Sequence, residues 1–144
     1  MLFRSVRYII KKRKIDLEKK LDKKTLGEIL LTPTKIYVKS CLAAAKSGAV
    51  KGFAHITGGG LLENIPRILP KNLCAEIDYS AWQMPEIFQF LQKEGNIKNQ
   101  EMQRTFNCGI GMVVICSPQN VAKLKKIFAE FDEEVLEIGV IKKI

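Results

Sequence analysis

The chain lacks the residue patterns that mark a metal site or a disulfide framework. Its 144 residues include one histidine and four cysteines, and no two cysteines form a C-x-x-C pair. A single histidine with widely spaced cysteines does not give the ligand spacing of a zinc site. We therefore predict no metal ligands in this sequence, and we expect the cysteines to be small buried residues of a reduced, cytoplasmic protein.

Long apolar runs are missing as well. No stretch approaches the roughly 18–20 apolar residues that a membrane-spanning helix needs. The first ten residues carry two arginines within their apolar pattern and no small-residue cleavage site, which is unlike a secretion signal. Membrane partners are therefore not expected.

Positive charge is abundant but unevenly distributed. The net charge is +9, and residues 1–24 hold ten lysines and arginines against three acidic residues. A basic segment on a nearly neutral body can indicate nucleic-acid binding. Its only aromatic residues are Phe3 and Tyr8, so stacking on bases is not supported. The favoured interpretation is a solvated basic helix and connector over residues 1–24, followed by a domain over residues 25–144.

The apolar periodicity predicts one layered domain of helices and strands. Helices are expected at 2–13, 25–31, 34–47, 61–69 (short or kinked at Pro66), 84–95, 99–106 and after Ser117-Pro118. Strands are expected at 52–56, 73–78, 108–116 and 135–141. Four strands interleaved with helices favour an α/β fold, with α+β as the alternative, built on a mixed β-sheet of about four or more strands. The last long helix is expected to join two strands as a crossover.

The most informative stretch is His55-Ile56-Thr57-Gly58-Gly59-Gly60, between an expected strand and an expected helix. Glycines can adopt positive φ and let the backbone approach a ligand. A glycine turn that opens a helix presents free N–H groups to an anion such as phosphate. The Thr57 hydroxyl can add a donor. The alternative is a strand-to-helix turn without a ligand.

Four stretches together resemble a known family. They are LTPTKIYVKS (31–40), AHITGGG (54–60), ENIPR (63–67) and EMQRTFNCGIGM (101–112). In order and spacing they resemble the C-terminal half of the phosphoribosylformylglycinamidine cyclo-ligases, also called aminoimidazole ribonucleotide synthetases. The resemblance extends from about residue 5 to the C-terminus.

The resemblance implies a cytoplasmic, homodimeric ligase of de novo purine biosynthesis. ATP and Mg²⁺ would activate the formyl oxygen of formylglycinamidine ribonucleotide, and a nitrogen of the same molecule would close the imidazole ring. The family's N-terminal ATP-binding half, with most ATP and Mg²⁺ ligands, has no counterpart in this sequence. We therefore expect a part of a split enzyme or a remnant, inactive alone. The alternatives are a non-catalytic anion- or nucleotide-binding module and, less favoured, a basic nucleic-acid-binding domain.

Nine residues are candidates for the site, and each has a simpler alternative role. His55 is the candidate catalytic residue, moving a proton or contacting phosphate, unless it only bonds to backbone at a strand end. Arg67 is expected to bind phosphate, unless it is a surface arginine. Arg104 and Asn107 either line the same cleft or tie a loop. The full set for substrate or phosphate is Thr57, Gly58, Gly59, Gly60, Asn64, Arg67, Arg104 and Asn107.

Overall fold

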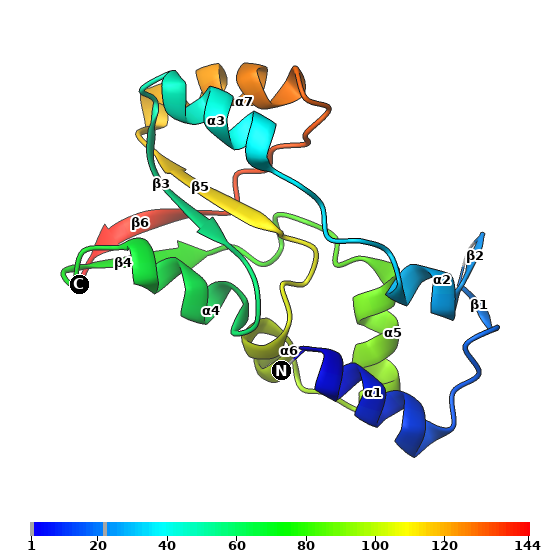
Figure 1. Ribbon diagram of the computed structural model, residues 1–144. Coiled ribbons are helices and arrows are strands. Elements are labelled where there is room, and N and C mark those ends of the chain that lie inside the picture. The colour runs from blue at the N-terminus through cyan, green and yellow to red at the C-terminus, as the bar shows by residue number, and fades with distance from the viewer. Residues whose placement is uncertain (1, 22) are drawn as a thin grey trace.

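The computed structural model describes residues 2–21 and 23–144, with side chains from residue 4 onward in those ranges (Figure 1). The α-helices are α1 (Leu2–Arg13), α2 (Leu26–Leu30), α3 (Val38–Lys46), α4 (Gly60–Asn64), α5 (Glu86–Gly95), α6 (Asn99–Thr105) and α7 (Val121–Ala129). Two 3-10 helices follow other elements, η1 (Ile65–Ile68) and η2 (Pro118–Asn120). The strands are β1 (Lys20–Leu21), β2 (Lys24–Thr25), β3 (Val50–His55), β4 (Leu73–Ile77), β5 (Met112–Cys116) and β6 (Gly139–Lys143).

The strands form three separate antiparallel pairs, β1 with β2, β3 with β5, and β4 with β6. The expected mixture of helices and strands is confirmed, but the predicted sheet of four or more strands is wrong for the described residues. The crossover expectation also fails, because the chain after α7 brings β6 to β4 and not into the sheet of β5. Similar apolar patterns arise in one large sheet and in two paired ones, so the sequence did not distinguish them.

The β3–β5 pair lies between two apolar layers. On one side, α3 and α7 cover it and enclose a cluster of buried residues, namely Ala44, Ala49, Leu124 and Phe128. On the other side, α4 and η1 pack against it together with the β4–β6 pair, around Ala54, Ile56, Leu61, Ile65 and Val113. Figure 1 shows α3 and α7 together above the two strands and α4 below them. The end of β3, where the glycine turn begins, is thus held from both sides.

A third cluster forms where α1, α5 and α6 meet. Ile9 of α1 is buried against Leu91 of α5 and against Met102 and Phe106 of α6 and its end. The predicted helix over residues 2–13 is confirmed as α1. This cluster holds α6 in place, and α6 in turn packs against Gly60 of the glycine turn.

Short local signals gave the most accurate boundaries. The helix expected from residue 25 is present as α2, with Thr25 as its N-cap. The Thr25 hydroxyl accepts the Glu28 N–H at 3.2 Å, and the Glu28 carboxylate accepts the Thr25 N–H at 2.7 Å. Pro66 divides the predicted helix 61–69 into α4 and η1. The final strand begins four residues later than predicted, at Gly139.

Two other boundaries are wrong for local reasons. The helix expected over 34–47 begins only at Val38, after an extended segment that follows Pro33. The strand expected over 108–116 begins at Met112, because Cys108 and Gly109 adopt φ values of 51° and 105° and form a turn.

The cysteines only partly match the prediction. Cys108 is buried, Cys41 and Cys116 are half-buried, and Cys74 is exposed. Cys74 lies on β4, where exposure alternates along the strand, and it falls on the outer face. Within the described residues, no helix is both long enough and apolar enough to cross a bilayer.

Candidate functional site

The glycine turn is fixed between the end of β3 and the end of α6. The Ile56 N–H donates to the Gly111 carbonyl at 2.9 Å and extends the β3–β5 ladder to the start of the turn. Gly59 and Gly60 then have φ values of 101° and 58°, which other residues rarely adopt. A Cβ at Gly60 would collide with the Gln103 carbonyl oxygen. By contrast, a Cβ at Gly58 would meet nothing within 4 Å, so that position is open.

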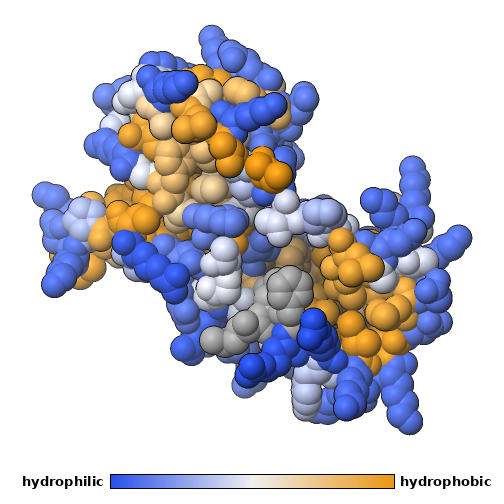
Figure 2. Space-filling model, in the orientation of Figure 1, coloured by the Kyte–Doolittle hydropathy of each residue, from blue (hydrophilic) through white to orange (hydrophobic). Residues whose placement is uncertain are grey.

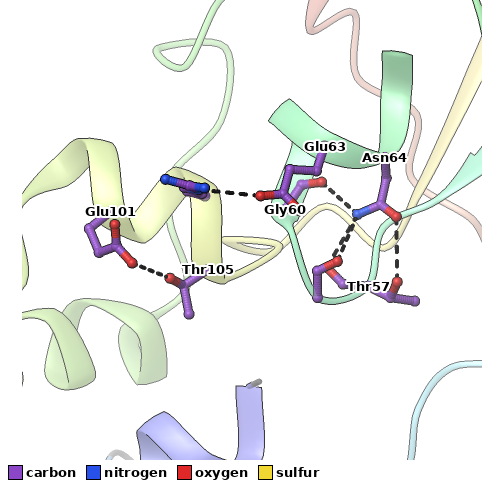
Figure 3. Close-up of polar contacts among 8 residues, drawn as sticks. Thr57, Gly60, Glu63, Asn64, Glu101 and Thr105 are labelled. Carbon is purple, nitrogen blue, oxygen red and sulfur yellow. Dashed lines mark hydrogen bonds and ion pairs between the residues drawn. The ribbon is translucent and has the colours of Figure 1, made fainter. Parts of the chain in front are cut away.

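Asn64 holds the carbonyl groups of the turn. Its side-chain Nδ2 donates to the Gly60 oxygen at 2.7 Å and to the Gly58 oxygen at 3.3 Å, with a longer contact of 3.5 Å to the Thr57 oxygen. The Thr57 hydroxyl donates to Asn64 Oδ1 at 3.5 Å. Asn64 is only 5% exposed, so these bonds are protected from water. Figure 3 shows the Asn64 amide surrounded by the turn.

Asn64 occupies carbonyl groups of the turn, whereas two of the turn's amide groups, at the exposed Gly58 and the buried Gly59, are not hydrogen-bonded within the described residues. The Gly60 N–H donates to the Thr57 carbonyl at 3.1 Å. Within residues 2–21 and 23–144, the N–H groups of Gly58 and Gly59 have no acceptor. Two neighbouring free N–H groups can bind an anion. The helix that follows is only five residues long, so its dipole contributes less than the sequence suggested.

Arg67 is held beside this turn. Its Nη1 donates to Asn64 Oδ1 at 3.1 Å, while the residue is exposed. A guanidinium has five N–H donors, so most of its donors remain for a ligand. The predicted residues Thr57, Gly58, Gly60, Asn64 and Arg67 therefore belong to one hydrogen-bonded group.

Arg104 contacts the same region from α6. Its Nε lies 3.2 Å from the Glu63 Oε1, and both side chains are substantially exposed. Figure 3 shows this ion pair joining α6 to α4, with Thr105 bonded to Glu101 beside it. An exposed pair of this kind contributes at most about 1 kcal/mol to stability. Its main consequence is that a second arginine lies near the turn.

Asn107 is placed differently. Its side-chain oxygen accepts the Gly109 N–H at 3.1 Å, and its carbonyl accepts the Ile110 N–H at 3.0 Å. These contacts close the turn before β5. These bonds tie a loop, and no hydrogen bond among the described residues joins Asn107 to the glycine turn.

His55 ends β3 with an exposed imidazole. Its ring lies edge-on to Tyr37, with 6.1 Å between the ring centroids. In the described part of the chain the imidazole makes no hydrogen bond, so the alternative of a histidine bonded to backbone is not what the structure displays. The imidazole is therefore available to a ligand near Thr57.

Tyr37, which lies beside His55, was not among the candidate site residues. A Cβ at Gly111 would collide with the Tyr37 hydroxyl, so this glycine allows the phenol to reach the start of β5. Burial raises the pKa of Tyr37, which keeps the phenol neutral. The contact joins two of the stretches singled out in the sequence, LTPTKIYVKS and EMQRTFNCGIGM. Both stretches belong to the same family resemblance, and this was the only sequence signal that they could lie close together in the fold.

The structure thus defines a class: an α/β domain with a glycine-rich strand-to-helix turn, free backbone donors and an adjacent arginine. The chain belongs to the family described as AIR synthase related protein, C-terminal domain, whose model matches residues 5–143. The family resemblance proposed from the four sequence stretches is therefore confirmed.

Named relatives support the same assignment. The chain is 48% identical over 138 residues to a phosphoribosylformylglycinamidine cyclo-ligase of Neisseria meningitidis serogroup C, covering 95% of this chain and 40% of the relative. It is 49% identical over 137 residues to the cyclo-ligase of Paraburkholderia phymatum, covering 95% and 39%. The chain therefore spans about two fifths of the length of these relatives.

Proposed function

We propose that this chain forms the C-terminal, substrate-binding part of an ATP-dependent phosphoribosylformylglycinamidine cyclo-ligase. Such an enzyme closes the imidazole ring of formylglycinamidine ribonucleotide to give aminoimidazole ribonucleotide, in the cytoplasm. The observation that carries the proposal is the 48% identity over 95% of the chain, which includes the complete glycine turn.

The turn is the proposed site of a phosphate group of the substrate. The N–H groups of Gly58 and Gly59 would donate to phosphate oxygens, and the Arg67 guanidinium would supply a charge-assisted bond. Asn64 would act indirectly, because it holds both the turn and Arg67 in place. Arg104, from α6, would add positive charge on the other side of Glu63.

His55 is the proposed proton-moving residue at ring closure. Its exposed imidazole lies at the end of β3, two residues before Thr57 of the turn. Imidazole can both donate and accept a proton near neutral pH. The phenol of Tyr37 lies against the same ring and would orient it.

ATP and Mg²⁺ belong to the proposed reaction through the family. In the described part of the chain, no three His, Cys, Asp or Glu side chains are close enough to hold a metal ion. As the family resemblance implies, the metal ligands and most ATP contacts would lie in polypeptide outside this chain. A homodimer, as the family implies, would be assembled with that polypeptide.

The direct test is reconstitution. The isolated chain is expected to show no ATP consumption dependent on formylglycinamidine ribonucleotide, because phosphoryl activation needs ligands that it lacks. Co-purification with the part of the Neisseria meningitidis relative outside the matched 138 residues is expected to produce turnover, and His55→Ala in this pair should reduce it. Turnover by the isolated chain would contradict the proposal.

A non-catalytic anion-binding module is the second candidate, because the free N–H groups and Arg67 serve either role equally. Phosphate binding without turnover in any reconstituted pair would favour it.

A further inference from the structure

A large, mainly apolar groove lies between the β3–β5 pair and the β4–β6 pair, and its lining includes Tyr37 and Gly111. It has a volume of about 670 Å³ and is lined by residues 109–116 and 133–141, together with side chains of α7, η1 and β4. This volume lies in the range of about 300–1,000 Å³ found for ligand pockets, so size alone does not identify the occupant. The arrangement of backbone along its two sides is more informative.

Every residue of β5 lines the groove, and so do consecutive residues of the segment leading into β6. Successive side chains of a strand point to opposite faces, so a groove on one face would be lined by alternate residues only. An uninterrupted run means that the groove lies against the edge of each strand. Figure 1 shows β5 and β6 as neighbours, and no ladder joins them.

The unpaired edge of β5 can be assigned residue by residue. The Ile56 N–H donates to the Gly111 carbonyl, and backbone groups of antiparallel strands alternate in direction. Gly111, Val113 and Ile115 therefore face β3, while Met112 and Val114 direct their N–H and C=O groups away from it. Among the described residues, these outward groups have no backbone partner.

The same reasoning applies to β6. The Asp78 N–H donates to the Ile138 carbonyl at 2.8 Å, and the Ile144 N–H donates to the Asn72 carbonyl at 3.1 Å. Even-numbered residues of β6 thus face β4, while Gly139 and Ile141 direct their backbone groups outward. No acceptor or donor within the described residues meets them. Two open edges therefore border one groove.

The walls specify which kind of segment fits. On one side α7 contributes apolar side chains, and on the other η1 and β4 do. The lining side chains on these two walls are Val121, Leu124, Phe128, Ile65, Ala75 and Ile77. An inserted strand would present its side chains alternately to both walls, so it must be apolar on both faces where it passes between them. Charged residues also line the groove, namely Lys35, Glu133, Glu134 and Glu137.

We propose that the groove accepts one extended, apolar β-strand from the polypeptide that the cyclo-ligase relatives possess beyond the region matched here. This strand would pair with the open edges of β5 and β6 and join the two strand pairs into one sheet. The proposal rests on the proposed function, in which polypeptide of that kind completes this chain. The match covers 40% of the relative, so the larger part of its length lies outside the matched region and is available to supply the strand.

The test uses overlapping 15-residue peptides covering the part of the Neisseria meningitidis relative outside the matched 138 residues. Binding is followed by NMR on the ¹⁵N-labelled chain. At least one apolar peptide is expected to bind and to slow amide exchange at Met112, Val114, Gly139 and Ile141 by about tenfold or more, because these N–H groups become hydrogen-bonded.

The best apolar peptide is also fused after Ile144 through a Gly/Ser linker, which raises its effective concentration to the millimolar range.

Two variants check the binding mode. Val114→Pro removes an outward N–H without removing a bond to β3, as an edge position allows, and Ile141→Pro does the same in β6. Each is expected to weaken peptide binding at least about tenfold, whereas the matched variants Val114→Ala and Ile141→Ala keep the N–H and should bind within about twofold of wild type. Circular dichroism and the NMR spectrum establish that each variant is folded.

The proposal is overturned if neither the free peptides nor the fusion protect these four amides, or if binding is insensitive to both prolines. It is also overturned if the chain alone protects them by self-association that Val114→Pro abolishes, because a second copy would then be the occupant. None of these measurements uses turnover. If reconstitution of activity fails, the peptide-binding result can still be interpreted. If peptide binding fails, the proposed function is not contradicted.

Discussion

The Arg67 guanidinium donates to the side-chain oxygen of Asn64 at 3.1 Å, on the amide whose nitrogen holds the carbonyls of Gly58 and Gly60. One buried side chain therefore shapes the glycine turn and positions the nearest cation. The turn's carbonyl groups are occupied by this amide, and its free N–H groups remain for an anion. The proposed anion binding at this turn would thus depend on an uncharged residue that itself contacts no ligand.

Replacing Arg67 with alanine is expected to weaken anion binding without changing the fold. Loss of one charge-assisted hydrogen bond costs about 1.5–3 kcal/mol, or roughly 10- to 150-fold in the dissociation constant. Isothermal titration of inorganic phosphate or ribose 5-phosphate at low salt measures it. Arg7→Ala, at an exposed arginine of α1, is the matched control and should bind like wild type. Equal affinities for Arg67→Ala and wild type would exclude Arg67 from the site.

Gly60 and Gly58 should differ sharply when each is replaced with alanine. At Gly60, φ is 58° and the new Cβ would collide with the Gln103 carbonyl, so we expect a loss of at least about 2 kcal/mol of unfolding free energy. At Gly58 the Cβ meets open space, and the change should be within about 0.5 kcal/mol. Urea denaturation compares the two variants. Similar losses at both positions would mean that the turn is not held against α6 as described.

Sequence reasoning located the glycine turn because its cause is local. Three consecutive glycines between a strand pattern and a helix pattern can be recognised without any knowledge of distant contacts. The start of α2 at Thr25 and Glu28 depends on local residues in the same way. The central role of Asn64 was less visible. Asn64 was only one of the candidates for substrate or phosphate binding, because its bonds to the turn carbonyls depend on how α4 folds back over Gly58 and Gly60.

The sheet was harder to predict for a physical reason. The strand expected over 108–116 ends in the apolar run Met112–Cys116, and only Val113 of that run is buried. Such a run is equally compatible with a central strand and with an edge beside an open groove. The path of long connections, such as the one through α7, decides which strands pair. Local sequence patterns do not reveal that path.

The buried thiol of Cys108 should make stability depend on alkaline pH. Burial raises the pKa of Cys108 to about 11, whereas the unfolded thiol titrates at its ordinary value of about 8.5. Between these values the unfolded state binds fewer protons, so the unfolding free energy falls as pH rises. The contribution is fully present below about pH 8.5 and is lost progressively towards pH 11.

The comparison with Cys108→Ala isolates this effect from other groups that titrate in the same range. Unfolding free energies of both proteins are measured by urea denaturation from pH 7 to pH 10.5. The advantage of wild type over Cys108→Ala is expected to shrink by roughly 1.4 kcal/mol for each pH unit between the two pKa values. A difference that stays constant with pH would contradict an elevated pKa.

Exposed apolar side chains on α3 predict self-association of the isolated chain. Val38 is 60% exposed and Leu42 is 54% exposed on one side of the helix, and Figure 2 shows hydrophobic residues gathered over this region. Light scattering at increasing concentration should reveal association that Val38→Glu/Leu42→Glu reduces. Val38 begins α3, where a carboxylate favours the helix dipole, so the helix itself should persist. Tyr8→Glu, an equally exposed site on α1, is the control and should associate like wild type. A wild-type chain that remains monomeric over a wide concentration range would show that this surface does not mediate self-association.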